Sequence, residues 1–210
     1  MIQFGCIIQA RSGSTRLPNK CFRELPNGNN LTEHIYKIVN KVVPFTIVAV
    51  PRNDEKIIEM LRSKNIPHYC GSEEDVLDRY YQCAKYYGMK MIGRVTADCY
   101  AMLDSELFFM TNMAMNGRVD FSSNTFKPKT CYEGTDYEIM SFRCLEWLHK
   151  TSVNNKYREH CTNFIYEKEE IFLKTGMTLW KRSWPLNLSH IKTSIDTILD
   201  WENMEKMLVK

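Results

Sequence analysis

The sequence predicts an α/β protein with a Rossmann-like, mostly parallel sheet flanked by helices. Three observations support this fold class. Short apolar runs alternate with segments whose apolar residues recur at helical spacing, which is typical of successive βαβ units. Several of the runs are rich in β-branched residues, as expected of buried strands. Polar loops directly follow two of the runs, at the sheet edge where open α/β folds bind their ligands.

The first half of the chain shows this alternation most clearly. Apolar runs predict strands at residues 4–8, 45–50, 68–70 and 91–95. Apolar residues at helical spacing predict helices at residues 31–42, 54–63 and 72–87. Thr32 is the expected cap of the first helix, and the acidic residues 73–75 suit the first turn of the third. This order implies parallel strands joined by right-handed crossovers.

Predicted strands and helices alternate less regularly beyond residue 104. The sequence there predicts helices at residues 107–115, 142–150, 158–167 and 197–209. It predicts strands at residues 121–124, 137–141 and 192–195, with residues 180–185 irregular or extended. The 210 residues contain no repeats or low-complexity segments, so they fit one domain that is large enough for a full core.

Composition excludes several classes of protein. The net charge of +3 comes without a basic stripe, so we expect no nucleic-acid partner. No apolar stretch approaches the roughly 20 residues that span a bilayer, and the first residues do not resemble a secretion signal. We therefore expect a cytoplasmic protein without a membrane partner. The eight cysteines include no C-x-x-C pair, so we expect reduced core residues rather than a metal knuckle or a disulfide framework.

Residues 9–20, QARSGSTRLPNK, form the most informative loop. It follows the first predicted strand and carries Arg11, Arg16 and Lys20 among small residues. Small residues let backbone N–H groups approach a phosphate, and guanidinium groups bind phosphate bidentately. The loop therefore suits a triphosphate, although it lacks the P-loop motif G-x-x-x-x-G-K-[ST]. By charge pattern alone, it is also typical of a solvated surface turn.

A carboxylate follows another predicted strand. Asp98 lies in the segment RVTADC (residues 94–99), directly after the strand at 91–95. It should therefore point into the same crevice as the loop. A single carboxylate suits Mg²⁺, which keeps phosphate and water oxygens as its other ligands. An Asp at this position is also a common helix cap.

Three segments resemble a known family. The loop at 9–20 is similar to the x-x-A-R-x-G-S-x-R-L-P-x-K loop of cytidylyltransferases of the spore coat polysaccharide biosynthesis type. These enzymes are related to acylneuraminate and 3-deoxy-manno-octulosonate cytidylyltransferases. Residues 71–80, GSEEDVLDRY, and residues 94–99 match further motifs of the same family. The resemblance covers nearly the whole chain and implies the nucleotide-diphospho-sugar transferase (GT-A-like) fold. Asn19 departs from the family's usual glycine.

The resemblance implies a nucleotide site. The loop would hold the triphosphate of CTP, and residues 71–80 would lie beside the cytosine and ribose. The expected nucleotide-binding residues are Gln9, Ala10, Arg11, Ser12, Gly13, Ser14, Thr15, Arg16, Lys20, Gly71, Ser72, Asp75, Arg94, Thr96 and Ala97. Asp98 corresponds to the family's metal-binding carboxylate, and Asp196 corresponds to a second one or is only the cap of the last helix. Asp78 and Arg79 could instead form an ion pair with each other.

The resemblance also implies an acceptor site. Residues 133–138, EGTDYE, and 158–162, REHCT, resemble acceptor-side motifs of the family. The expected acceptor-binding residues are Tyr100, Asn124, Asp136, Glu138, Arg158 and His160. Arg158 could bind a carboxylate or phosphate bidentately, whereas His160 on a helix is also a common type of structural histidine. Tyr100 replaces the family's usual proline, and Glu133 its usual aspartate.

Together these segments imply a Mg²⁺-dependent cytidylyltransferase with Arg11, Arg16, Lys20 and Asp98 as catalytic residues. It would transfer CMP from CTP to an acidic small-molecule acceptor such as an acidic sugar, for surface polysaccharide or glycan biosynthesis. Residues 1–103 would form the nucleotide-binding half and residues 104–210 the acceptor-binding half. The alternatives are a phosphorylated or phosphonate acceptor, another nucleoside triphosphate, and a non-catalytic nucleotide-binding homologue. A homodimer is a further expectation from related enzymes.

Overall fold

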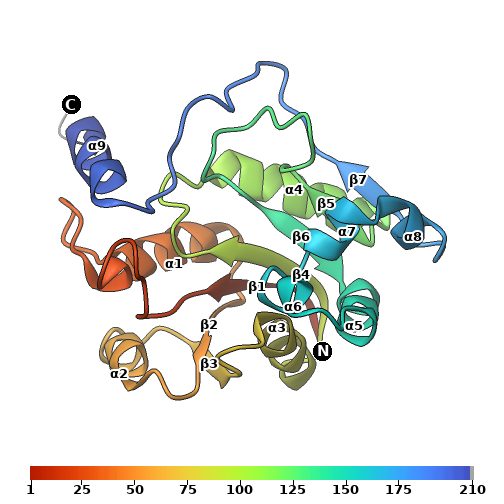
Figure 1. Cartoon of the computed structure of the whole chain (residues 1–210), viewed down its shortest axis with the longest axis horizontal. Helices are drawn as coiled ribbons and strands as arrows, with labels where there is room; N and C mark the ends of the chain where they lie inside the picture. Colours follow the sequence, from red (N-terminus) through yellow and green to blue (C-terminus); the bar gives the residue numbers. More distant parts are fainter. Residues whose placement is uncertain (209–210) are drawn as a thin grey trace.

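Seven strands form a mixed sheet at the centre of the molecule (Figure 1). The computed structural model describes residues 1–208, and its strand order is β3-β2-β1-β4-β6-β5-β7. The strands are β1 (Ile2–Gln9), β2 (Thr46–Pro51), β3 (His68–Gly71), β4 (Met89–Thr96), β5 (Phe121–Ser123), β6 (Glu138–Ser141) and β7 (Leu179–Lys181). Strand β6 is antiparallel to both of its neighbours, β4 and β5, and the other strand pairs in the described chain are parallel. The predicted fold class is confirmed.

Helices cover both faces of this sheet. They are α1 (Leu31–Val42), α2 (Glu55–Ser63), α3 (Val76–Tyr86), α4 (Asp104–Gly117), α5 (Phe142–Thr151), α6 (Asn155–Glu159), α7 (Asn163–Glu167), α8 (Glu169–Leu173) and α9 (Ile198–Leu208), with a 3₁₀ turn at Lys20–Phe22. Residues of α1, α2, α4 and α9 share one apolar cluster with Cys6 and Ile8 of β1. Residues of α3, α5, α7 and α8 share a second cluster with Ile7. The alternation along β1 therefore sends successive side chains to opposite faces.

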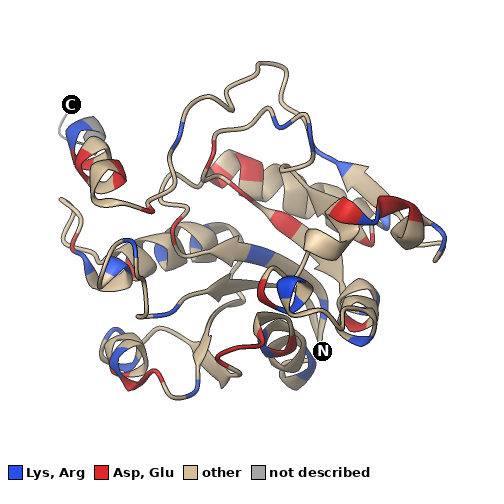
Figure 2. Ribbon diagram, in the orientation of Figure 1, with Lys and Arg blue, Asp and Glu red and all other residues tan. Residues whose placement is uncertain are grey.

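Side-chain caps determine where the first helices begin. Asn30, rather than the expected Thr32, accepts a backbone N–H of α1. Asp54 and Asp75 cap α2 and α3 in the same way. Residues 73–75 therefore precede α3 instead of forming its first turn, and they appear as the acidic segment that leads into this helix in Figure 2. Such caps satisfy N–H groups that have no partner within the helix.

The predicted strand at 192–195 is wrong. This segment contributes only an isolated bridge, between Glu133 and Lys192. Thr193 N donates to Glu133 O (2.6 Å), and Ile195 N donates to Asp98 O (3.0 Å). The backbone N–H groups of this segment therefore bond to two different loops, those of Glu133 and Asp98, and the segment does not extend the sheet.

The predicted helix at 158–167 is also wrong, because the chain forms two short helices, α6 and α7. The break between them lies at Cys161 and Thr162, which are both buried. The hydroxyl of Thr162 donates to Glu138 Oε1 (2.9 Å), which fixes the turn against the sheet. The sequence also gave no indication of α8. A tertiary hydrogen bond therefore overrides the helical spacing of the apolar residues here.

Charged residues of both signs are distributed over the helices and loops (Figure 2). Among residues 1–208, no helix combines the length and the apolar character needed to cross a membrane. The predicted end of the last helix, residue 209, lies outside the described residues.

Candidate active site

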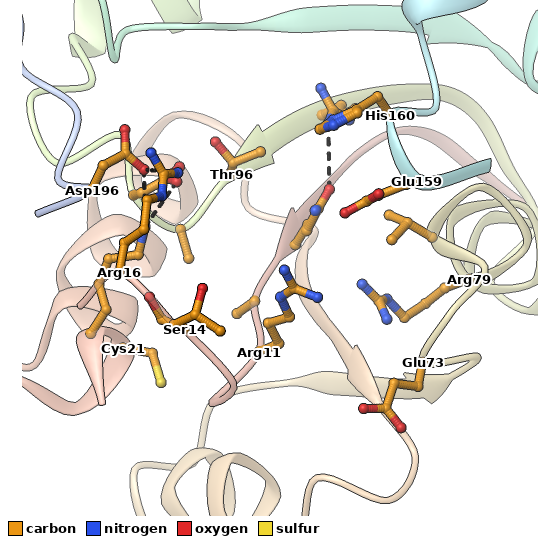
Figure 3. A pocket seen from close by; sticks show the side chains of 18 residues that line it. Arg11, Ser14, Arg16, Cys21, Glu73, Arg79, Thr96, Glu159, His160 and Asp196 are labelled. Carbon is orange, nitrogen blue, oxygen red and sulfur yellow. Dashed lines mark hydrogen bonds and ion pairs between the residues drawn. The ribbon is translucent and has the colours of Figure 1, made fainter. Parts of the chain in front are cut away.

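A cavity of about 290 Å³ opens at the carboxyl ends of β1 and β4 (Figure 3). We call it the main cavity. It lies in the crevice where open α/β sheets bind ligands. The predicted site residues that line it are Gln9, Ala10, Arg11, Ser14, Thr15, Arg16, Lys20, Arg94, Thr96, Ala97, Asp98, His160 and Asp196. The fold thus brings together the basic loop, the end of β4 and two segments from the second half of the chain.

Helix α2 holds the basic loop at both ends. Ser12 N donates to Asp54 Oδ2 (2.7 Å), and Lys56 Nζ donates to Asn19 Oδ1 (2.5 Å). Between these points, Leu17 is buried in the core. Asn19 has a φ of 57°, a left-handed conformation that glycine adopts most easily and that asparagine tolerates. Asn19 therefore takes a conformation that glycine at this position would also allow.

Two predicted nucleotide-binding residues, Ser12 and Gly13, lie outside the main cavity. They line a neighbouring cavity of about 390 Å³, next to the start of α2. Arg11 and Glu73 belong to both cavities. The two hollows are therefore contiguous around the side chain of Arg11.

Four charged side chains meet at one end of the main cavity. Lys20 Nζ lies 3.1 Å from Asp98 Oδ2 and 3.7 Å from Asp196 Oδ1, and it donates to Ile195 O (2.8 Å). Arg16 also donates to Asp196 Oδ1 (2.9 Å). Two cations of the loop, Lys20 and Arg16, therefore lie beside the two predicted metal carboxylates, as Figure 3 shows for Arg16 and Asp196.

The charge of Asp98 is stabilised despite its burial. Burial alone would raise the pKa of this carboxyl, but the Lys20 ammonium and the Thr96 hydroxyl outweigh it. The pKa of Asp98 is therefore lower than its ordinary value. An ionised carboxylate at neutral pH is the form that can bind a divalent cation.

Asp196 is not the capping residue of α9. Thr197 Oγ1 accepts the N–H of Asp200 (3.3 Å), while Asp200 Oδ2 accepts the N–H groups of Asp196 (3.0 Å) and Thr197 (2.8 Å). This reciprocal arrangement is a capping box. Burial would raise the pKa of Asp200, but these donors and Lys192 lower it to about 2. The carboxylate of Asp196 is left to face Arg16 and Lys20.

A second cavity of about 220 Å³ adjoins the main cavity. Arg94, Thr96 and His160 line both, and Asp136 and Glu138 line only the second. Arg94 Nη1 donates to Glu138 Oε2 (2.5 Å), so a buried ion pair forms the floor between the two hollows. Burial would lower the pKa of Arg94, but Glu138 raises it well above its ordinary value.

Two predicted acceptor-binding residues have structural roles instead. Asn124 is buried, and its side-chain amide bonds to Thr135 O (2.8 Å) and Tyr137 N (2.9 Å). Arg158 pairs with Asp75 (2.5 Å) and donates to backbone carbonyls at the end of α5. Neither residue lines the main, the neighbouring or the second cavity, and the protein itself satisfies their polar groups.

Other predicted residues also lie away from the cavities. Tyr100 packs in the core cluster on the α1 side of the sheet. Asp75 caps α3, and Ser72 Oγ accepts the N–H of Asp75 (3.1 Å), so both shape the turn before the helix. Gly71 is buried at the end of β3. None of these residues lines the main or the second cavity.

Sequence reasoning missed several residues that line the cavities. They are Cys21, Glu73, Val76, Arg79 and Glu159 in the main cavity, and Thr125, Thr162, Asn163 and Tyr166 in the second. The match of residues 71–80 to a family motif was a usable signal for Glu73, Val76 and Arg79. The match of residues 158–162 was a similar signal for Glu159 and Thr162, whereas the places of Asn163 and Tyr166 depend on the break between α6 and α7, which the sequence did not reveal.

Comparison with protein families decides the identity of this site. Residues 5–199 match the model of a family described as cytidylyltransferase. The chain belongs to the cytidylyltransferase family. An uncharacterized protein of Methanocaldococcus jannaschii is 31% identical over 93% of this chain and 79% of its own length. The spore coat polysaccharide biosynthesis protein SpsF of Bacillus subtilis is 24% identical over 97% of this chain and 85% of its own length.

Solved structures agree with this assignment. A cytidylyltransferase from Leptospira borgpetersenii superposes with a TM-score of 0.90 at 26% identity, covering 100% of this chain and 87% of its own. A CMP:2-keto-3-deoxy-manno-octonic acid synthetase, solved in complex with CTP, superposes with a TM-score of 0.70 at 12% identity. That likeness covers 99% of this chain and 98% of the synthetase, and it shows the fold. The fold and family predicted from the sequence are therefore confirmed.

Proposed function

We propose that this cytidylyltransferase uses Mg²⁺ to transfer CMP from CTP to an acidic sugar, or a related acidic small molecule, with release of pyrophosphate. The observation that carries the proposal is the meeting of Lys20 with Asp98 and Asp196 at one end of the main cavity. The product would be an activated precursor for a surface polysaccharide or glycan. The relative named for spore coat polysaccharide biosynthesis supports this role.

The two carboxylates fit a magnesium ion. Asp98 and Asp196 face the same ammonium group, so the space between them already suits a cation. Within residues 1–208, no group of three or more His, Cys, Asp or Glu side chains is placed to hold a metal. Magnesium commonly binds through one or two carboxylates, with phosphate oxygens and water as its other ligands. When bound, it would neutralise charge on the phosphates of CTP.

The chain's own cations would supply the remaining stabilisation. Arg11, Arg16 and Lys20 would hold the triphosphate in the main cavity. During transfer, an acceptor oxygen bonds to the α-phosphorus, and the bond from this phosphorus to the pyrophosphate oxygen breaks. The negative charge that builds on pyrophosphate would then meet groups already held in place. This reaction needs no protein nucleophile, and burial raises the pKa of the Cys99 thiol, which disfavours its thiolate.

We place the acceptor in the second cavity. It adjoins the main cavity through Arg94, Thr96 and His160, so a molecule there would lie next to the nucleotide. The hydroxyls of Thr125 and Tyr166 on its wall bond to each other (2.6 Å), and the carboxylate of Asp136 on the same wall can accept from the hydroxyl groups of a sugar. His160 is exposed at the junction of the two cavities, where it could meet an acidic group of the acceptor.

A pyrophosphate-release screen tests this function. Each of the four ribonucleoside triphosphates is combined with a panel of acidic sugars, sugar phosphates and phosphonates, with and without Mg²⁺. We expect release that requires both CTP and Mg²⁺ and that depends on an acidic sugar. Release that depends on a phosphonate or phosphate alone would contradict the proposed acceptor. Absence of release with every combination would contradict the proposed reaction.

A further inference from the structure

A cavity of about 410 Å³ lies at the amino end of β4, so the length of this strand separates it from the main cavity. We call it the basal cavity. It lies between the start of the chain and helices α3 and α5, which Figure 1 shows on either side of the N-terminus. No residue that lines it also lines the main, neighbouring or second cavity. The proposed reaction therefore gives it no role.

The interior of the basal cavity is apolar. Met89 is buried, with 2% of its surface exposed, and Phe142 is half-buried beside it. Methionine side chains are flexible and polarizable, so they adapt to the shape of an apolar ligand. Sites for small organic ligands commonly have volumes of about 300–1,000 Å³ and largely apolar walls. The basal cavity meets both criteria.

Hydrogen bonds and ring contacts hold the walls of this cavity in place. Ile2 N donates to Gly88 O (3.0 Å), which joins the start of the chain to the turn after α3. Gly88 has a φ of 61°, a conformation that glycine adopts without strain. The ring of Phe142 stacks on that of Tyr81 in α3, with the ring centres 5.7 Å apart. The cavity is therefore formed before any ligand binds.

The rim of the basal cavity is positively charged. Lys85, Lys90 and Arg143 are its exposed lining residues with a charge, and no Asp or Glu lines it. Arg143 pairs with Asp120 (2.5 Å), whereas Lys85 and Lys90 pair with no carboxylate among residues 1–208. Lysine stems cover apolar surface while their ammonium groups stay in water. Two cations that no carboxylate neutralises thus border an apolar hollow, and this charge pattern is complementary to an anion with an apolar body.

We propose that the basal cavity binds a small aliphatic anion, such as a carboxylate on an unbranched chain. The chain lies against Met89 and Phe142, and the charged head lies beside Lys85 and Lys90. A cationic ligand would meet two ammonium groups of its own sign. An uncharged chain would leave both ammonium groups without a partner.

An anionic membrane offers the same two chemical features, an acidic head and an aliphatic chain. A membrane-binding face inserts its apolar side chains into the lipid while its cations stay at the headgroups. The basal cavity has the opposite order, because Met89 is buried behind two exposed lysines. We therefore assign the cavity to a free ligand, whose chain enters the protein.

NMR of methionine methyl groups tests this site directly. The protein is titrated with hexanoate and octanoate below their micelle concentrations, and Met89→Leu identifies the Met89 signal. We expect this signal to shift on binding. Affinity should rise about fourfold for each added methylene, because each one is transferred from water into an apolar cavity. 1-Octanol should bind more weakly than octanoate, and octylamine more weakly still.

Lys90→Glu reverses one charge at the rim. It should weaken octanoate binding about 3- to 10-fold and strengthen octylamine binding. Lys174→Glu is the matched control, because Lys174 is also exposed, pairs with no carboxylate among residues 1–208 and lines none of the four cavities. Its affinity for octanoate should equal that of the wild type. The ligand series on the wild type keeps the proposal testable if Lys90→Glu does not fold.

Five outcomes would overturn the proposal. The first four are an unchanged Met89 signal with octanoate, equal affinities for octanoate, 1-octanol and octylamine, equal losses in the two Glu variants, and displacement of octanoate by CTP. The fifth is sedimentation with phosphatidylglycerol vesicles by a protein that does not bind octanoate, which would identify a membrane-binding face instead. None of these outcomes concerns pyrophosphate release, so the proposed function is tested separately.

Discussion

Asp98 brings a negative charge to the end of the main cavity where Lys20 and Arg16 of the basic loop also lie. Asp98→Asn keeps the size of the side chain and its capacity to accept from Lys20, but removes the charge that a metal requires. We expect Mg²⁺-dependent pyrophosphate release to fall at least about 100-fold. The measurement is initial rate with CTP over a range of Mg²⁺ concentrations.

The control for Asp98→Asn is Asp104→Asn at the start of α4. Asp104 also pairs with a lysine, Lys41, but lies outside the main and second cavities. Its variant should keep the wild-type rate. A rate for Asp98→Asn within tenfold of the wild type would rule out Asp98 as the metal ligand.

Lys20 has two opposing effects in the proposed mechanism. Its ammonium binds phosphate, yet without ligands it lies between the two carboxylates that would hold the metal. Lys20→Ala should therefore slow turnover by about one to three orders of magnitude. The same variant should bind Mn²⁺ more tightly in the absence of nucleotide, because a competing cation has been removed. Calorimetry measures this second effect, and weaker Mn²⁺ binding would contradict the assignment of the carboxylates.

At the scale of elements, α2 links the core to the basic loop. Asp54 caps this helix and also accepts from Ser12 N, so one side chain fixes both. Asp54→Ala should lower the free energy of unfolding by about 1 kcal/mol through the lost cap. It should also raise the KM for CTP, because the loop loses its anchor and must be ordered by the ligand.

Asn30→Ala provides the matched control for Asp54→Ala. Asn30 caps α1 in the same manner, and its capping hydrogen bond does not reach the loop. Its loss should cost a similar amount of stability and leave the KM for CTP unchanged. Equal KM values for the two variants would show that Asp54 acts only as a cap.

The break between α6 and α7 has two consequences for the cavities. It exposes His160 at the junction of the cavities and turns Thr162 inward toward Glu138. Glu138 also accepts from Tyr166 (2.5 Å) and Arg94, so one buried carboxylate organises the second cavity. Local helical spacing carries no information about such a hydrogen bond between distant segments, which explains why the sequence predicted one continuous helix.

For the whole molecule, local patterns predicted the fold well where strand and helix alternate. The strands of the first half and the basic loop followed from apolar periodicity and from residue type. The roles of Asn124 and Arg158 could not be predicted in this way. Both carry groups that suit a ligand, and only the tertiary structure shows that backbone carbonyls, a backbone N–H or Asp75 already occupy them. Burial of the Arg79 guanidinium, which pairs with no carboxylate among residues 1–208, is likewise visible only in three dimensions.

Ionised carboxylates also connect distant parts of the molecule. Asp120, at the start of β5, accepts from Arg143 of α5 (2.5 Å) and from the N–H of Thr178 (3.0 Å). Burial alone would raise the pKa of Asp120, but these donors lower it. Asp200 of α9 has a pKa of about 2 for similar reasons. A group whose pKa is lower in the folded chain stabilises the fold above its unfolded pKa, near 4 for Asp.

The stability of the whole chain should therefore fall in acid. The contribution of each such carboxylate is lost as the pH drops through its folded pKa, so the loss should occur between about pH 4 and pH 2. Urea midpoints should be nearly constant from pH 7 to pH 5 and decrease below that range.

Asp120→Asn should lower the free energy of unfolding by about 1–3 kcal/mol at pH 7, because Arg143 and the N–H of Thr178 lose an ionised acceptor. Its midpoint should also fall less steeply in acid than that of the wild type, since one titrating group is gone. Parallel pH profiles for the two proteins would show that Asp120 does not contribute to the acid sensitivity of the fold.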